Sequence, residues 1–409
     1  MHATGPVADD VTGRRSLPAR RRGLAAGVAA AALLLAAAGC TLGSDRSRAA
    51  GPPPAGAASS RSTTSAAGLA GMPPPSDPLD VYAADRPGRL SPLARRFRSL
   101  VYVPNSGSGT VDVIDPRSYR IVAHFATGRQ PQHVTPSWDL RTLWVTNDQG
   151  NSLTPIDPRS GRPGRPLPVA DPYNLYFTPD GRFAIVVAEQ LRRLDFRDPH
   201  SMRLRHTLLV PCAGVDHMDF SADGRYAIAS CEFSGQLLKL DVARQRVLAT
   251  LRLGGAMPMP QDVKLSPDGR VFYVADMMTG GVWLVDGGRF KAIGFVRTGA
   301  GAHGLYTSRD SRVLYVSNRG EGSISLLSFA TRTVVATWRL PGGGSPDMGG
   351  VSADGRVLWL AGRYHRKVYA IATASGRLLA RIRVGDGPHG LCVYPQPGRY
   401  SLGHTGVFR

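Results

Sequence analysis

Residues 266–276 read Ser-Pro-Asp-Gly-Arg-Val-Phe-Tyr-Val-Ala-Asp, and this short stretch decides the fold of the chain. Its Asp-Gly pair supplies the positive φ that a tight hairpin needs, and the apolar run that follows is rich in β-forming residues. Similar Ser/Thr-x-Asp-Gly turns recur at residues 178–181, 221–224 and 352–355. A turn of one kind that returns in this way indicates a repeat protein.

The β-rich runs after these turns set the period of the repeat. They begin 41 to 45 residues apart, at Ser99, Arg141, Arg182, Arg225, Arg270, Arg312 and Arg356. One period holds about four short strands and no helical pattern, and a single sheet of that size cannot cover its own two faces. The sequence therefore predicts an all-β fold, a seven-bladed β-propeller of four-stranded antiparallel blades over residues 99–398.

Several of the runs share a four-residue motif. It stands at Tyr102-Val103-Pro104-Asn105, Trp144-Val145-Thr146-Asn147, Tyr273-Val274-Ala275-Asp276 and Tyr315-Val316-Ser317-Asn318. These runs resemble the motif of the YVTN-repeat propellers, a WD40-like family, while the other blades carry Ala188, Cys231 and Gly362 in place of Asn. The resemblance covers roughly residues 99–399; it implies the fold and leaves the function open, since one fold hosts many activities.

The ends of the repeat predict how the ring closes. We label the strands of a blade A to D, with the Asp-Gly turn between A and B. The first repeat starts at its B strand, and the chain ends with an extra A-like run, residues 390–393. We expect that run to pair with residues 101–103, so that both termini build one blade and no sheet edge stays open. The alternative is that the tail, residues 399–409, forms an eighth B strand.

The N-terminal region predicts export. Five arginines within residues 14–22 precede an apolar stretch, residues 24–38, that is too short for a comfortable membrane span. Ala37-Ala38-Gly39-Cys40 resembles a bacterial lipobox, whose cysteine carries the lipid, and the whole resembles an exported lipoprotein of actinobacterial type. We expect residues 1–40 to be a signal peptide and the protein to be an extracytoplasmic membrane lipoprotein anchored at Cys40; cleavage after Ala38, giving a soluble secreted protein, stays open.

Two further segments precede the propeller. Residues 41–78 are mostly Pro, Gly, Ser, Thr and Ala with almost no large apolar side chain, so we expect a disordered linker, and residues 79–98 lead into the first blade. The formal charge is +20, but the arginines are scattered and form no basic stripe. We therefore expect no nucleic-acid partner, and a monomer.

The strand directions place the D-A and B-C loops on one face, where binding residues usually lie. The last residues before the A strands supply seven candidate ligand-binding residues around the channel mouth: His133, Asn174, His217, Asp262, His303, Asp347 and His389. The histidines resemble the channel-mouth histidines that hold copper in nitrous oxide reductase or contact haem in nitrite reductase propellers. The leading hypothesis is a surface-tethered binding or scaffold protein for a protein, glycan or small ligand, with no cofactor required; a purely structural ring of histidines is the alternative.

Sulfur atoms on the same face suggest a second function. His217 and His303 would bind copper or another divalent metal together with Cys212, Cys231, Met257, Met259, Met277 and Met278, because soft ligands suit copper. Against this, Cys212 and Cys231 flank one hairpin of an exported protein, where a disulfide is expected. The two interpretations exclude each other, since a disulfide has no thiolate.

An enzyme is the third possibility and the sequence favours it least. The chain has no Gly-x-Ser-x-Gly elbow, no His-Glu-x-x-His, no phosphate-binding loop and no Cys-x-x-Cys-His. Lactonases and lyases also use propellers around a divalent cation, and their ligands would correspond here to Glu189, Asn105, Asn147, Asp276 and Asn318. The simpler interpretation makes these residues part of the B-C turns.

Overall fold

The computed structural model describes residues 68–404 and 406–409. The predicted signal peptide, the candidate lipid acceptor Cys40 and most of the predicted linker lie outside the described residues. Three 3-10 helices accompany the strands: η1 (Ala83–Asp85), η2 (Ala94–Arg96) and η3 (Glu232–Ser234). Among the described residues, no helix has the length and apolar character needed to cross a membrane.

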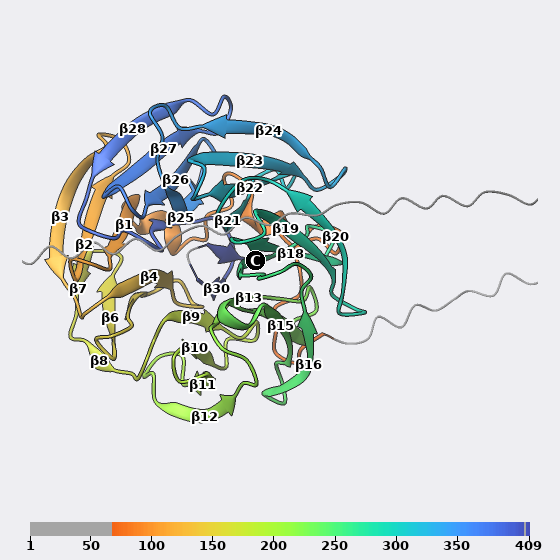
Figure 1. The fold of residues 1–409 in the computed structure, drawn as a ribbon. Coiled ribbons are helices and arrows are strands. Elements are labelled where there is room, and N and C mark those ends of the chain that lie inside the picture. The colour runs from red at the N-terminus through yellow and green to blue at the C-terminus, as the bar shows by residue number, and fades with distance from the viewer. Residues whose placement is uncertain (1–67, 405) are drawn as a thin grey trace, which may run out of the picture. The chain divides into compact units, whose positions relative to one another are not determined.

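Seven antiparallel sheets surround a central channel as the blades of a propeller (Figure 1). The A strand of each blade lies innermost and contacts the A strand of the next blade. In ring order the A strands are β29 (Cys392–Tyr394), β4 (Pro131–Pro136), β9 (Asn174–Phe177), β13 (Val215–Phe220), β17 (Pro260–Leu265), β21 (Ala302–Thr307) and β25 (Pro346–Val351). The predicted seven-bladed fold is confirmed.

The B and C strands are largely buried between neighbouring blades. The B strands are β1 (Leu100–Asn105), β5 (Leu143–Asn147), β10 (Ala184–Ala188), β14 (Tyr226–Cys231), β18 (Val271–Asp276), β22 (Val313–Asn318) and β26 (Val357–Gly362). The C strands are β2 (Thr110–Asp115), β6 (Ser152–Asp157), β11 (Arg193–Arg197), β15 (Gln236–Asp241), β19 (Gly281–Asp286), β23 (Ser323–Ser328) and β27 (Lys367–Ala372).

The D strands form the outer rim and are mostly exposed. They are β3 (Arg120–Ala126), the broken pair β7 (Arg162–Pro163) and β8 (Leu167–Pro168), β12 (Leu204–Leu209), β16 (Arg246–Arg252), β20 (Lys291–Arg297), β24 (Val334–Arg339) and β28 (Leu378–Arg383). The break in the second blade has a simple cause, because Pro163, Pro166 and Pro168 cannot donate to a strand ladder and are tolerated only at an edge.

The Asp-Gly turns adopt the conformation that the sequence predicts. In the turn of the fourth blade, Gly224 has φ of 70°, and the Ser221 hydroxyl donates to Asp223 Oδ1 at 2.7 Å. The backbone N–H of Arg225 donates to the same carboxylate at 3.1 Å. The side chain of Asp223 thus replaces backbone partners that the tight turn cannot supply.

The ring closes as the extra A-like run predicts. Strand β29 pairs antiparallel with β1, in a register that sets Val101 opposite Val393 and Tyr102 opposite Cys392. The first blade therefore contains strands from both ends of the propeller, which leaves β1 without an open edge.

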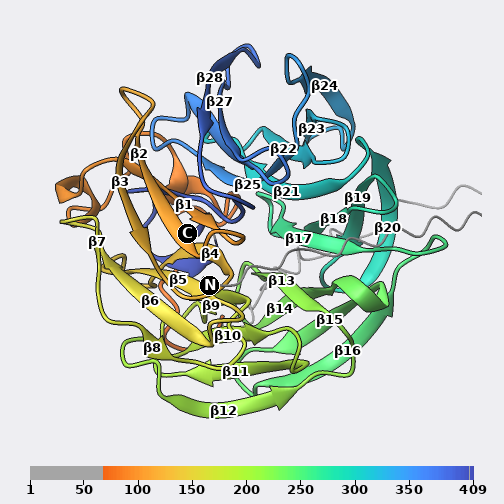
Figure 2. The same cartoon turned by 60° about the vertical axis from the view of Figure 1, so that its left-hand side comes forward.

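The C-terminal tail lies inside the ring instead of adding an eighth B strand, so that alternative is wrong. Strands β30 (Ser401–Gly403) and β31 (Val407–Phe408) form a hairpin, and β30 pairs with β9 on the inner side of the third blade. Figure 1 shows the C-terminus within the circle of A strands, and Figure 2 shows the ring of blades from a second direction. The physical reason is burial, because Leu402, Val407 and Phe408 fill apolar space between blades.

The described N-terminal segment crosses the face that carries the A-B turns. The backbone N–H of Leu69 donates to the Asp223 carbonyl at 2.8 Å, and the N–H of Val81 donates to the Pro267 carbonyl at 2.9 Å. Further along, a buried ion pair joins Asp85 to Arg309. This segment covers the A-B face, on the opposite side from the D-A and B-C loops.

Candidate functional site

Five histidines meet in the channel, and we call them the channel histidines. Three lie within the first three residues of an A strand, namely His133, His217 and His303; His389 precedes β29, and His404 comes from the tail. The ring centroids of His133 and His389 lie 4.9 Å apart, those of His217 and His404 4.7 Å, and those of His303 and His389 5.7 Å. The repeat placed four of these residues at one level, as the sequence predicts, whereas the fifth lay in a segment without a repeat signal.

Burial disfavours the protonated form of the channel histidines. Each is at most 2% exposed, and burial lowers the pKa of His133 to about 4 because desolvation disfavours the charged ring. Burial also holds the pKa of the other four channel histidines well below the usual range of histidine. Neutral imidazoles can accept a hydrogen bond or bind a metal.

One carboxylate ties the channel ends of the sixth, seventh and first blades together. Asp347 Oδ2 lies 2.7 Å from His389 Nδ1, and Asp347 Oδ1 lies 3.3 Å from His303 Nδ1. The guanidinium of Arg319 donates to Asp347 Oδ1 at 3.1 Å. The buried charge of Asp347 is thereby paired, as a buried charge must be.

The amide of Asn174 connects the tail to the fourth blade. Its Nδ2 lies 3.0 Å from His217 Nδ1 and 3.2 Å from His404 Nδ1, while its Oδ1 accepts the N–H of Leu175 at 2.9 Å. An amide nitrogen is a donor only, so both Nδ1 atoms act as acceptors here. The lone pairs of His217 and His404 therefore point toward the same group.

Asp262 has a structural role in the described channel. Its two oxygens accept the N–H groups of Val263 and Leu305, each at 2.9 Å, so the side chain fastens the fifth blade to the sixth. Asp219 makes the equivalent contacts from the fourth blade to the fifth, through Leu265. Both oxygens of Asp262, which the sequence suggests as a ligand-binding residue, therefore already accept hydrogen bonds from backbone amides.

The structure brings the seven predicted channel residues to one level and also buries all of them. Their relative exposure is 0 to 2%, so an outside ligand does not reach these side chains in the described arrangement. The sequence did not predict this burial, because the C-terminal tail contributes to closing the channel and the tail carries no repeat motif. The loops one layer further out are accessible to a ligand.

The sulfur candidates separate into different environments. Cys212 and Cys231 are joined by a disulfide, with their Cα atoms 6.1 Å apart, so neither offers a thiolate. Met257 and Met278 are largely exposed, and Met277 Sδ lies 2.6 Å from Arg319 Nη2. Among the described His, Cys, Asp and Glu side chains, the group close enough to share a metal is His133, His217 and His404.

The residues considered for a lactonase-like site take part in the B-C turns or their supports. Asn147 Nδ2 donates to Ser152 Oγ at 3.2 Å and to Thr154 Oγ1 at 2.9 Å. The equivalent bonds hold for Asn105 and Asn318, and Asp276 accepts the N–H of Met259. These side chains stabilise the loops, as the simpler interpretation of the sequence predicts.

Glu189 sits in an acidic group beside the channel. Burial, followed by the charges of Glu232 and Asp148, raises the pKa of Glu189 to about 8. Burial and the neighbouring Asp171 raise the pKa of Asp148 to about 7. The raised pKa values of Glu189 and Asp148 show that burial among carboxyl groups disfavours the ionised forms of these two side chains.

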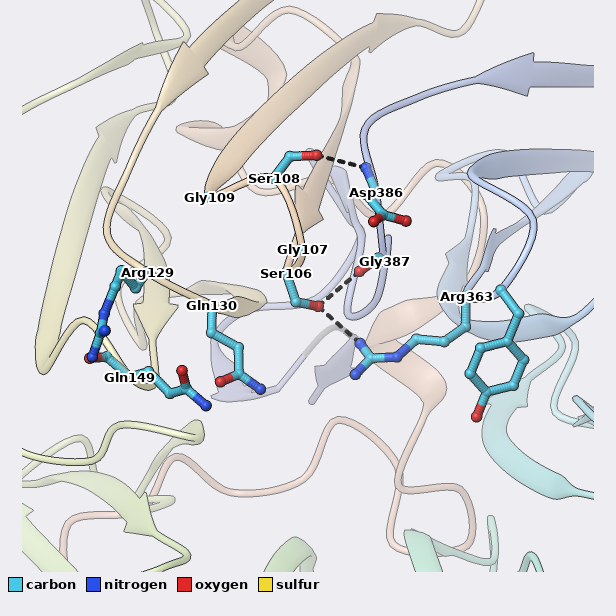
Figure 3. A pocket seen from close by; sticks show the side chains of 11 residues that line it. Ser106, Gly107, Ser108, Gly109, Arg129, Gln130, Gln149, Arg363, Asp386 and Gly387 are labelled. Atoms are coloured by element: carbon cyan, nitrogen blue, oxygen red, sulfur yellow. Dashed lines mark hydrogen bonds between the residues drawn. The ribbon is translucent and has the colours of Figure 1, made fainter. Parts of the chain in front are cut away.

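An open cavity of about 770 Å³ lies on the D-A and B-C face, between the first, second and seventh blades (Figure 3). Its lining comes from five loops: Ser106, Gly107, Ser108, Gly109, Arg129, Gln130, Gln149, Arg363, Tyr364, Asp386 and Gly387. The cavity lies on the face that the sequence predicts for ligand binding. The sequence did not predict the residues that line it, because they are loop residues next to the motif positions and share no pattern.

Two guanidinium groups define the chemistry of the cavity. Arg363 Nη1 donates to Ser106 Oγ at 3.0 Å, and Arg129 Nη2 donates to the Gln149 carbonyl at 2.9 Å. Figure 3 shows Gln130 between them and Asp386 on the far side of the Ser106 loop. With two cations, one carboxylate and several hydroxyl and amide groups, the cavity suits an acidic ligand that is rich in hydrogen-bonding groups.

Comparison with known proteins agrees with this fold. A family model described as a YNCE-like β-propeller matches residues 82–398. Similar solved structures include the dihydro-heme d1 dehydrogenase NirN in complex with DHE, with 18% identity, a TM-score of 0.56 and 78% of each chain covered. Hydrazine synthase of Kuenenia stuttgartiensis has 19% identity and a TM-score of 0.56, covering 71% of this chain and 93% of its own.

A third similar structure is a functionally unknown protein from Desulfotomaculum acetoxidans DSM 771, with 14% identity and a TM-score of 0.62. It covers 73% of this chain and 99% of its own length. No curated protein matches the sequence. At such low identities the similarity shows the fold alone.

Proposed function

This chain belongs to the YNCE-like β-propeller family, and from that premise we propose that it is an exported binding protein that holds an acidic ligand in the cavity between Ser106, Arg129 and Arg363. The cavity on the loop face is the observation that carries this proposal. A carboxylate- or phosphate-bearing glycan fits it best, because such a ligand offers anionic groups to the two guanidiniums and hydroxyls to the amides.

The rest of the fold supports binding on this face. The described N-terminal segment covers the A-B face, so the cavity lies on the opposite side from that segment. Strong pairing of the loops, such as the Ser106 hydroxyl with the Gly387 carbonyl at 2.7 Å, keeps the cavity formed without a ligand. A preformed site loses less entropy when the ligand binds.

The proposal is tested by binding of acidic and neutral oligosaccharides to the purified protein and to an Arg129→Ala/Arg363→Ala variant. We expect the wild type to bind a uronic-acid oligosaccharide or a phosphorylated glycan more tightly than its neutral analogue. The variant should lose at least about tenfold in affinity, because each charge-assisted hydrogen bond contributes about 1.5–3 kcal/mol. Calorimetry measures both values.

The matched control is Arg120→Ala, which removes an exposed arginine from the outer strand β3. It changes the net charge without touching the cavity, so its affinity should equal that of the wild type. The proposed site would be contradicted if the double variant bound every acidic ligand with the same affinity as the wild type.

We also propose that a lipid on Cys40 holds the protein at the outer side of the membrane, as the lipobox-like sequence suggests. Metabolic labelling with a fatty acid should mark the wild type and leave Cys40→Ala unlabelled. Equal labelling of the two proteins would remove the anchor from the proposal.

A further inference from the structure

We propose that His133, His217 and His404 bind one late first-row transition-metal ion, with Zn²⁺ as the reference ion, and that this ion fastens the C-terminal hairpin inside the propeller. Each histidine offers one ring nitrogen, and the three nitrogens lie within 4.8 Å of one another. They come from the second blade, the fourth blade and the tail. The proposal is independent of the ligand cavity.

The hydrogen bonds of His133 and His217 identify the nitrogen of each ring that carries the lone pair. His133 Nδ1 lies 3.0 Å from the Tyr173 carbonyl, so that nitrogen carries the proton, and the buried Nε2 has no hydrogen-bond partner among the described residues. His217 accepts at Nδ1 from Asn174; its Nε2 lies 3.2 Å from Asp216 Oδ1, although the two atoms form no hydrogen bond in the described structure. The metal-binding nitrogens are therefore Nε2 of His133 and Nδ1 of His217.

The third ring follows the same pattern. His404 Nδ1 lies 3.2 Å from the Asn174 amide, and Asp262 Oδ1 stands 3.8 Å from Nε2 on the other side of the ring. The lone pairs of His217 and His404 thus converge on the Asn174 amide, which the ion would displace by a side-chain rotation. Behind the His133 ring, the Tyr173 carbonyl makes the kind of outer hydrogen bond that orients metal-binding histidines.

The ligand set selects the class of metal. Three neutral imidazoles suit zinc, copper or nickel, and they suit calcium and magnesium poorly, because those ions prefer oxygen. The set contains no cysteine and no methionine, so it differs from the sulfur-rich site considered from the sequence. Bound nitrogens lie about 3.3 Å apart around a tetrahedral zinc ion, so the rings must move inward by only about 1–2 Å.

Binding would fix the tail because His404 is the ligand that the hairpin contributes. Its backbone N–H already donates to the Leu175 carbonyl at 2.8 Å, and the adjoining Gly403 pairs with Tyr176. A Cβ on Gly403 would lie 2.4 Å from the Tyr176 Cα, so the hairpin approaches the third blade as closely as a backbone can. The metal would add a bond to the second and fourth blades across the channel.

The test uses the full chain, refolded from denaturant with and without Co²⁺ or Zn²⁺ so that the buried site is accessible. We expect one Co²⁺ per chain, with the visible absorption bands of a tetrahedral nitrogen site, and displacement by Zn²⁺. Zn²⁺ should raise the melting temperature of the wild type. His404→Gln should lose at least about 100-fold in affinity and the melting shift, since it removes a direct ligand.

The control is His206→Gln, which changes an exposed histidine of β12 and should keep the wild-type affinity. His133→Gln provides a second ligand variant, and the metal-free melting curve of each variant shows that it folds. Retention of wild-type Co²⁺ affinity in both ligand variants, or absence of stoichiometric Co²⁺ in the refolded wild type, would overturn the proposal.

Discussion

Deletion of residues 388–409 is expected to abolish cooperative folding. The deletion removes β29 and exposes the paired edge of β1 to solvent, where its unpaired backbone groups can bind another chain. It also removes the buried side chains of Leu391 and Val393 from the core between the first and seventh blades, and that of Cys392 from the core between the first and second blades. The truncated protein should form aggregates, and scanning calorimetry together with light scattering measures both effects.

A shorter deletion separates closure of the ring from filling of the channel. Removal of residues 399–409 leaves β29 paired with β1 and takes away only the hairpin in the channel. We expect this protein to melt cooperatively at a lower temperature than the wild type. If the longer deletion melts cooperatively at the parental temperature, pairing of β29 with β1 does not hold the ring together.

The variant Arg409→Met is expected to lower the free energy of unfolding by about 3–5 kcal/mol. The reason is that it leaves the buried carboxylate of Asp219 without its partner. Arg409 Nη2 donates to Asp219 Oδ1 at 2.8 Å, and the two side chains are 7% and 0% exposed. The guanidinium also lies 4.8 Å from the centre of the Tyr82 ring, so it links the tail to the N-terminal segment. Urea denaturation at neutral pH measures the loss.

The control for this variant is Arg399→Met, which removes an exposed arginine from the same tail and should cost less than about 1 kcal/mol. Arg409→Lys keeps the charge and should retain part of the stability, although a lysine cannot reproduce the fork of the guanidinium. A loss below about 1 kcal/mol for Arg409→Met would show that the Asp219 carboxylate does not depend on Arg409.

The sequence predicted the features of the fold that arise from local chemistry repeated at a fixed spacing. The Asp-Gly turns located the hairpins, their period predicted the number of blades, and the extra A-like run at residues 390–393 predicted the closure. The histidines before the A strands were placed at one level for the same reason. Each of these inferences needs only the strand geometry and the requirement that every blade bury its faces.

The tail and the cavity could not be predicted because they depend on contacts between distant parts of the chain. Strands β30 and β31 contain three and two residues, too few for a period to be visible, and their position is set by burial of Leu402 and Phe408. His404 reaches Asn174 across 230 residues of sequence. The cavity is likewise lined by Ser106, Arg129 and Arg363 from separate loops of the ring, and no local sequence pattern predicts that these residues lie close together.

Hydrogen exchange of the protein with and without a bound acidic oligosaccharide tests the central claim, that the loop face holds the ligand. We expect slower exchange in residues 106–109, 129–130 and 363–364, the loops that line the cavity. The A-B turns, such as residues 266–270, should exchange at the same rate in both samples. Protection confined to the A-B turns, with none in the cavity loops, would contradict binding of the ligand on the loop face.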